Sequence, residues 1–170
     1  MRRSIALTFL LCTLITNGCK NEPIEPFELS VADFNYSMAY SILYRLTNDS
    51  LTITYRGELE NERDSIIFTT TELPKNKIRE LSQIRIDSLS AYYSNDCIAD
   101  GDIKVLLFKK NDTLKRIQLN NYYHHELSPA IEIINKIVPE RFKMYYDKNE
   151  LMDRMENCED KQIIKNWPVE

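Results

Sequence analysis

Apolar residues occupy every second position over a long N-terminal part of the chain. This period of two is typical of a β-strand with one buried face. Asn48-Asp49-Ser50 has the composition of a turn, and alternation resumes over residues 51–55. The pattern predicts one long strand that forms a hairpin with the strand that follows. The apolar positions of the long strand are Phe34, Tyr36, Met38, Tyr40, Ile42, Tyr44 and Leu46.

Three further segments are predicted to be strands, at residues 65–71, 103–109 and 114–119. The second of these contains four consecutive apolar residues, Val105 to Phe108. Such a run is typical of a central strand that is buried on both faces. Asn111-Asp112-Thr113 then predicts a tight turn into the last of the three strands.

Four segments have helical signals. Each begins with Pro at the first position or with a side chain that can cap the free N–H groups of a first turn. The predicted order is βββα-ββα-α, an α+β domain with a largely antiparallel sheet of about five strands and three or four helices. The helices are predicted to begin at Pro74, at Asp87 (a short helix carrying Leu89 and Tyr92), at Ser128-Pro129 and at Asp147 (a helix whose Leu151, Met152 and Met155 face the core).

The first residues have the pattern of an export signal. Met1-Arg2-Arg3 is basic, and residues 5–15 are apolar but too few to span a bilayer. Gly18 precedes Cys19, and a polar stretch follows. This segment, about the first 22 residues, resembles the signal peptide and lipobox of bacterial lipoproteins, in a loose form similar to those of Bacteroidota. The resemblance implies that Cys19 receives lipid and becomes the mature N-terminus.

Two other readings of the N-terminus stay open: an ordinary secretory signal that contains a cysteine, and a twin-arginine signal at Arg2-Arg3. The lipoprotein interpretation divides the chain into a signal peptide (1–18), a tether (19–30) containing Pro23 and Pro26, and one α+β domain (31–170). It implies a lipid-anchored protein of the cell envelope, at the outer membrane or the cell surface. Beyond the lipobox, the sequence resembles no characterised family.

Composition excludes several classes of function. The net charge of −4 becomes −6 when Arg2 and Arg3 are removed with the signal peptide, which argues against binding to nucleic acid or to anionic lipid. After cleavage only Gly57 and Gly101 remain, so a Gly-rich nucleotide loop is excluded. No cofactor is expected.

Cys97 and Cys158 are the two cysteines left after the signal peptide and the anchor are set aside. In an oxidising compartment we expect them to form a disulfide, closing a loop of about 60 residues. The alternative is two separate buried thiols.

The sequence matches metal-binding and catalytic motifs only in part. Residues 95–102 have Asp at two positions of a calcium loop but lack the required Glu, so a tight turn with Gly101 at positive φ is the better interpretation. His124 and His125 are the only histidines, and adjacent strand residues point to opposite faces. No metal site is therefore predicted. The acidic run Glu58, Glu60, Glu62 and Asp64 is interpreted as a solvated loop.

The one compositional indication of function is the ten tyrosines. Adjacent tyrosines cannot all be buried on a strand, and exposed tyrosines are enriched at protein interfaces. We therefore take Tyr93, Tyr122, Tyr123, His124 and His125 as a candidate binding surface, with core packing as the alternative.

Together these observations predict a non-catalytic binding module whose partner is another envelope protein or a secreted protein. One specific alternative is an immunity or inhibitor lipoprotein that neutralises a secreted toxin. A second alternative is a small hydrolase of envelope polymers, which needs a histidine and a carboxylate converging in a pocket.

Overall fold

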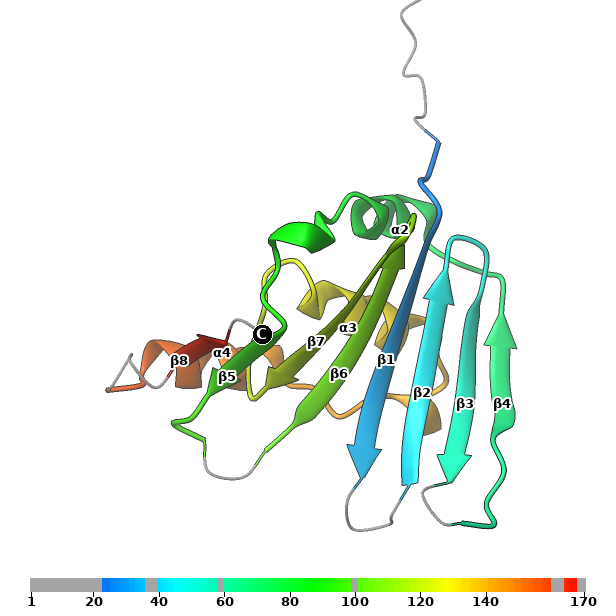
Figure 1. Ribbon diagram of the computed structural model, residues 1–170. Coiled ribbons are helices and arrows are strands. Elements are labelled where there is room, and N and C mark those ends of the chain that lie inside the picture. The colour runs from blue at the N-terminus through cyan, green and yellow to red at the C-terminus, as the bar shows by residue number, and fades with distance from the viewer. Residues whose placement is uncertain (1–22, 36–39, 58–59, 99–100, 160–163, 168–170) are drawn as a thin grey trace, which may run out of the picture.

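The computed structural model describes residues 23–35, 40–57, 60–98, 101–159 and 164–167. The predicted signal peptide and Cys19 lie outside this part of the chain. The described residues form one mixed eight-stranded sheet in the order β4-β3-β2-β1-β6-β7-β5-β8 (Figure 1). Its β5–β7 pair is parallel, and the other described pairs are antiparallel. The strands are β1 (Phe27–Asn35), β2 (Tyr40–Thr47), β3 (Leu51–Gly57), β4 (Ser65–Thr70), β5 (Tyr92–Asn95), β6 (Ile103–Lys110), β7 (Thr113–Asn120) and β8 (Ile164–Trp167).

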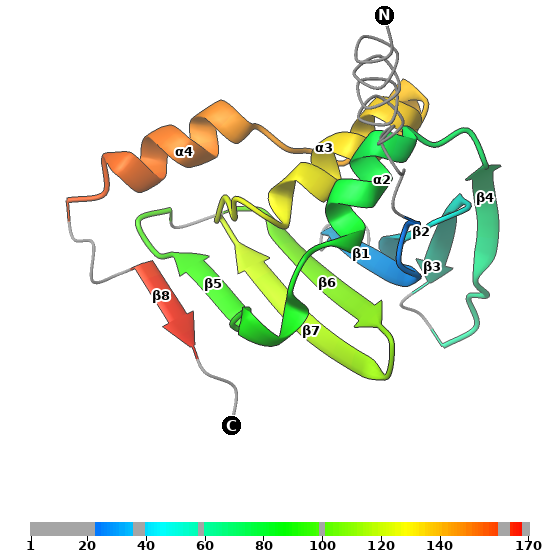
Figure 2. The same cartoon turned by 90° about the horizontal axis from the view of Figure 1, so that it is seen from above.

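Three α-helices in the described part of the chain lie on the same side of the sheet, as two perpendicular views show (Figures 1 and 2). The molecule is thus a two-layer α+β structure, and the predicted fold class is confirmed at this level. The helices are α2 (Lys75–Ser82), α3 (Ser128–Ile137) and α4 (Lys148–Glu156), with short 3₁₀ turns η1 (Ile86–Ser88) and η2 (Glu140–Phe142).

The core lies between the sheet and α2 and α3. Strand pairing places Val31, Tyr44, Ile53, Leu106 and Ile117 in one row across five strands, all fully buried. We call this side of the sheet the covered face. Against it pack the apolar side chains of the two helices, among them Ile78, Leu81, Ala130, Ile131 and Ile134.

The predicted long strand over 34–46 is wrong, because the chain reverses within it. β1 ends at Asn35 and β2 begins at Tyr40, and the two strands pair antiparallel. The buried apolar side chains of β1 are at odd positions, among them Leu29 and Val31, whereas those of β2 are at even positions, Tyr44 and Leu46. A hairpin conserves the period of two while shifting its phase, so alternation alone does not reveal the turn.

β1 begins at Phe27, inside the segment predicted as a tether. Asn48 holds this end of the strand: its Oδ1 accepts a hydrogen bond from the Phe27 N–H (3.0 Å), and its Nδ2 donates to the carbonyls of Ile24 (3.3 Å) and Glu25 (3.2 Å). Residues 27–30 are therefore strand residues, and Phe27 and Leu29 belong to the core.

The prediction of about five strands is also too low. The helix expected from Asp87 is only the 3₁₀ turn η1, and Tyr92 lies in β5. β5 and β8 have four residues each, too few for alternation to distinguish them from a loop.

The central strand β6 also differs from its prediction. Leu106 and Phe108 are fully buried on one side, and on the other side Val105 is buried (8% exposed) but Leu107 is 39% exposed, so the strand is buried on both faces only in part. The α-helices cover only one side of the sheet (Figure 2). Burial on both faces therefore accounts for Val105, Leu106 and Phe108 of the apolar run but not for Leu107.

The helices α3 and α4 differ from their predictions in detail. Ser128 is the first residue of α3 and not its cap. Asp147 caps α4 as expected, since its side chain accepts a hydrogen bond from the Glu150 N–H (2.9 Å). The residues of α4 that were expected to face the core, Leu151, Met152 and Met155, are only half-buried.

Candidate functional site

The five residues predicted as a binding surface come together in two small groups. The ring of Tyr93 lies 5.3 Å from that of Tyr122 and 4.5 Å from that of His124, measured between centroids. The ring of Tyr123 lies 5.4 Å from that of His125. The sequence therefore identified neighbours in space, although they come from β5 and from the segment that leads into α3.

Burial changes the role of this cluster. Tyr93 and Tyr123 are buried, Tyr122 and His124 are half-buried, and only His125 is exposed. Two of the five residues are therefore packing residues that a partner would not reach. Core packing, the alternative considered from the sequence, accounts for Tyr93 and Tyr123.

His124 stabilises the start of α3. Its Nδ1 accepts hydrogen bonds from the N–H groups of Glu126 (3.2 Å) and Leu127 (3.3 Å), while its own backbone N–H donates to Ser128 Oγ (2.9 Å). Burial lowers the pKa of His124, with a smaller opposing effect from the Glu126 carboxylate. The ring is thus held neutral with its proton on Nε2, and Nδ1 is not free to act as a base.

His125 lies at the edge of a shallow hollow of about 290 Å³. Glu80 of α2 and Glu126 line the same hollow. On the other side of the adjacent Tyr123, Lys148 Nζ lies 4.9 Å from the ring centroid, in a cation–π arrangement.

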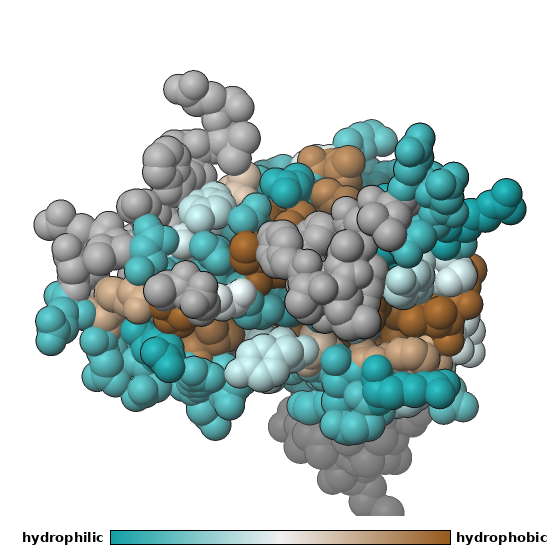
Figure 3. Space-filling model, turned by 90° about the horizontal axis from the view of Figure 1, so that it is seen from below, coloured by the Kyte–Doolittle hydropathy of each residue, from teal (hydrophilic) through white to brown (hydrophobic). Residues whose placement is uncertain are grey.

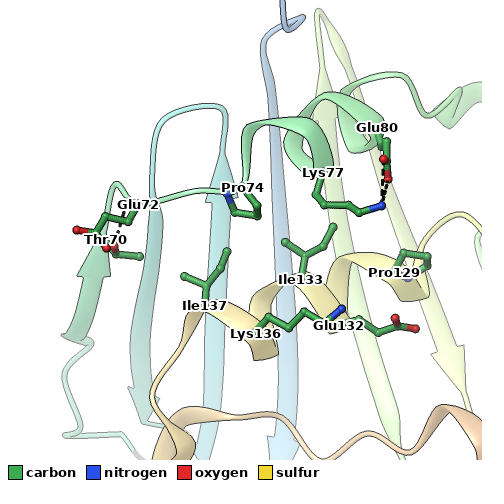
Figure 4. Close-up of a pocket in the computed structure, with 10 residues that line it drawn as sticks. All are labelled: Thr70, Glu72, Pro74, Lys77, Glu80, Pro129, Glu132, Ile133, Lys136 and Ile137. Carbon is green, nitrogen blue, oxygen red and sulfur yellow. Dashed lines mark hydrogen bonds and ion pairs between the residues drawn. The ribbon is translucent and has the colours of Figure 1, made fainter.

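A pocket of about 550 Å³ lies between α2 and α3 (Figure 4). Ile133 and Ile137 of α3 point into it. Its charged side chains are Glu72, Lys77, Glu80, Glu132 and Lys136, and its remaining lining residues are Thr70, Pro74 and Pro129. The volume is within the range of ligand-binding sites, about 300–1,000 Å³.

The pocket and the hollow beside His125 share Glu80, Pro129 and Ile133. The two cavities therefore adjoin at these residues, and we call them together the α2–α3 groove. An apolar floor between charged edges suits an extended segment of a partner protein. The two helices are some 50 residues apart in the chain, so no local pattern in the sequence signals the groove.

Two ion pairs lie along the edges of the groove. Lys77 Nζ is 2.7 Å from Glu80 Oε2, and Lys148 Nζ is 3.7 Å from Glu132 Oε1. Lys136 forms no hydrogen bond or ion pair with another described residue. Its ammonium group is therefore available to meet a ligand.

The predicted disulfide between Cys97 and Cys158 is present, with the two Cα atoms 5.9 Å apart. It connects the turn after β5 to the chain just beyond α4. Because α4 buries no residue completely, this covalent link is a main attachment of the helix to the sheet.

The turn before β6 is stabilised by side-chain amides. Asn95 Oδ1 accepts a hydrogen bond from the Cys97 N–H (3.1 Å). Gly101 does not have the positive φ that was predicted; the left-handed residues in the described chain are Asn111 (φ of 53°) and Asn121 (φ of 52°), and Asn121 contacts this turn. Glycine is needed at 101 because a Cβ atom there would lie 1.6 Å from Asn121 Oδ1.

Neither the turn nor the acidic run forms a metal site in the described residues. Among them there is no group of three or more His, Cys, Asp or Glu side chains placed to hold a metal ion. Of the acidic run, Glu60, Glu62 and Asp64 are exposed, and Glu58 lies outside the described residues.

A buried charge cluster lies on the covered face. Lys104 is only 2% exposed, and its Nζ pairs with Asp33 Oδ1 at 2.9 Å and with Asp102. Burial raises the pKa of Asp102, although the Lys104 ammonium acts in the opposite direction. The ammonium is neutralised by two carboxylates, which is typical of a structural ion pair.

Among the described residues, no helix has the length and the apolar character required to cross a membrane. Comparison with protein-family models, with characterised proteins and with solved structures finds no match to this chain.

Proposed function

We propose that this protein is a lipid-anchored module of the bacterial cell envelope that binds another protein through the α2–α3 groove and has no catalytic activity of its own. Two independent features support export from the cytoplasm. The lipobox at Cys19 resembles that of exported lipoproteins, and the Cys97–Cys158 disulfide is typical of oxidising compartments.

The contacts of Asn48 limit how far such an anchor extends. They hold the chain from Ile24 onwards against the β2–β3 turn. In this proposal residues 19–23 separate the lipid from Ile24, and five residues of chain reach at most about 18 Å. The edge of the domain at Ile24 and Asn48 would stay close to the membrane, with little rotational freedom.

The observation that carries the binding role is that the pocket and the hollow of the α2–α3 groove adjoin each other between the two helices. Its floor includes Ile133 and Ile137, and its edges bear both ammonium and carboxylate groups. Apolar contacts supply affinity in such a site, while the charges select the partner. An envelope protein or a secreted protein provides such a segment; a secreted toxin is the specific case that would make this chain an immunity protein.

The anchor is tested by metabolic labelling with a fatty acid. We expect Cys19→Ser to abolish label incorporation and leave the precursor unprocessed. Cys12→Ser, within the apolar part of the signal, is the matched control and should retain the label. Label in the Cys19→Ser protein would exclude the anchor.

The groove is tested with a photocrosslinking amino acid placed at Lys136 of the full chain in the cells that produce it. The matched position is Asp153, which is exposed on α4 outside the groove. We expect a discrete crosslinked protein from position 136 and none from position 153. Crosslinks of equal yield at both positions, or none from position 136, would contradict binding in the groove.

One observation favours the hydrolase alternative: His125 shares a hollow with Glu80 and Glu126. Hydrolysis would require the imidazole to act with one of these carboxylates. We expect the purified full chain to release no soluble fragments from isolated peptidoglycan. Release that His125→Ala abolishes would replace the binding proposal with the hydrolase.

A further inference from the structure

The side of the sheet opposite the α-helices, here called the open face, is the second surface of the domain (Figures 1 and 2). Cross-strand pairing identifies its residues, because paired side chains point to the same side. In β6 and β7, Leu107 pairs with Arg116 and Lys109 pairs with Leu114. These four residues alternate apolar and cationic side chains on the open face, and we call them the checkerboard.

The checkerboard is accessible. Leu107 is 39% exposed and Leu114 is 65% exposed, and Lys109 and Arg116 are exposed as well. Farther along the same face, Ile66 of β4 is 70% exposed and pairs with Thr54. Three of the four large hydrophobic residues that are exposed in the described chain therefore lie on the open face. Exposed apolar groups rimmed by polar ones mark interaction sites.

The open face is also basic, although the chain has a net charge of −4. Arg45, Arg56, Lys109 and Arg116 are its described cationic side chains, and Glu28 is its described carboxylate. Arg45 Nη2 pairs with Glu28 Oε2 at 2.5 Å, and Arg56 Nε lies 3.5 Å from Asp64 of the adjoining loop.

Arg116 forms no ion pair with any described residue. The hydrogen bond from Arg45 is the main cause of the lowered pKa of Glu28, and the Lys109 charge contributes to it without an ion-pair contact. Positive charge at the checkerboard is thus in excess of the carboxylates around it.

Seen from the end of the molecule opposite α2, hydrophobic and hydrophilic residues lie side by side on the surface (Figure 3).

We propose that the checkerboard docks an acidic protein surface whose apolar centre contacts Leu107 and Leu114 while its carboxylates pair with Lys109 and Arg116. Charge complementarity identifies the partner surface as acidic. The checkerboard carries excess positive charge on a chain of net negative charge, so it attracts anionic surfaces and repels cationic ones. This site is distinct from the α2–α3 groove, since it lies on the other side of the sheet, and it does not depend on the groove being occupied.

An anionic bilayer is the competing source of negative charge. The net negative charge of the chain opposes its approach to such a surface as a whole. Leucine and cationic side chains also alternate over the two strands. This spacing matches that of side chains along an opposing protein strand, whereas a layer of lipid headgroups has no such repeat.

The test measures fluorescence anisotropy of labelled peptides against the full chain, purified in a neutral detergent. One peptide alternates glutamate with leucine, and its counterpart alternates lysine with leucine. We expect the glutamate peptide to bind, with an affinity that falls as the salt concentration is raised. The affinity should be about tenfold lower for the variant that combines Lys109→Glu and Arg116→Glu. Leu114→Ser should weaken it without altering the net charge.

The matched control combines Lys75→Glu and Lys143→Glu, which make the same change in net charge on exposed positions of the helical side. It should change the affinity by less than about twofold. Circular dichroism confirms that each variant is folded.

Equal weakening by the control, or equal binding of the lysine peptide, would overturn the proposal. The proposal would also be overturned if the glutamate peptide failed to bind while vesicles containing phosphatidylglycerol bound the wild-type chain and not the checkerboard variant. That result would assign the open face to the membrane.

Discussion

The two faces of β6 differ in what their side chains contact. Leu106 is fully buried against α-helical side chains, whereas its neighbour Leu107 is 39% exposed and lies opposite Arg116. The same contrast applies to charge: Lys104 is buried between two carboxylates on the covered face, whereas Arg45 pairs with Glu28 in contact with water on the open face. One strand thus contributes both stability and an accessible surface, and each role should respond differently to substitution.

The largest difference in the free energy of unfolding is expected between alanine substitutions of the adjacent residues Leu106 and Leu107. Leu106→Ala should lower the free energy of unfolding by about 3 to 4 kcal/mol, because it removes buried contacts and leaves a cavity. Leu107→Ala should lower it by less than about 1 kcal/mol, since water already reaches that side chain. Urea denaturation of both variants measures the difference; similar losses would mean that the open face is covered in solution.

Loss of an ion pair should likewise cost more stability on the covered face than on the open face. Lys104→Met leaves Asp33 and Asp102 without their cation, which we expect to cost about 2 to 3 kcal/mol of stability. Arg45→Met removes a solvated pair and should cost less than about 0.5 kcal/mol. Thermal and urea denaturation measure both variants. Equal losses of stability in Lys104→Met and Arg45→Met would contradict the burial of Lys104.

A smaller contrast is expected between tyrosine hydroxyls. Tyr44 Oη on the covered face donates a 2.7 Å hydrogen bond to the Phe142 carbonyl. Tyr44→Phe should cost about 1 kcal/mol because this partly buried hydrogen bond is lost from a hydroxyl in the core. Tyr92, on the open face, has only a 3.4 Å contact with Asn120 Nδ2, and Tyr92→Phe should change stability by less than about 0.5 kcal/mol. A larger loss for Tyr92→Phe would reverse the comparison.

The smallest effect is a protonation effect at the start of α3. Burial lowers the pKa of His124 from 6.5, so folding favours its neutral form. Its contribution to stability is present above pH 6.5 and is lost as the pH falls from 6.5 through the lowered value of the folded state. NMR titration of the imidazole should therefore place its midpoint below 6.5. A midpoint above 6.5 would contradict the capping role of Nδ1.

The fold class was predictable because period-two and helical patterns each reflect one buried face. Asp147 as a helix cap and the Cys97–Cys158 bridge were predictable from residue type and position. The reversal between β1 and β2 was not, because a shift in phase leaves the period unchanged. β5 and β8 were missed because four residues contain too little pattern.

The candidate sites show the same limit. Tyr93, Tyr122 and His124 were identified as a group, but their burial depends on what packs against them. The α2–α3 groove is formed by helices distant in the chain, and no local signal indicates it. The sequence contains both leucines and both cations of the checkerboard, yet only the pairing of β6 with β7 brings them together.

The sequence by itself determined an α+β domain with a lipobox-like N-terminus, too few glycines for a nucleotide loop and a pair of cysteines suited to a disulfide, because these follow from local pattern and composition. Only the tertiary structure decided which face of the sheet is covered. That outcome depends on where the connections place α2 and α3, since the helices bury whichever side they pack against and leave the cationic and apolar residues of the other side in water.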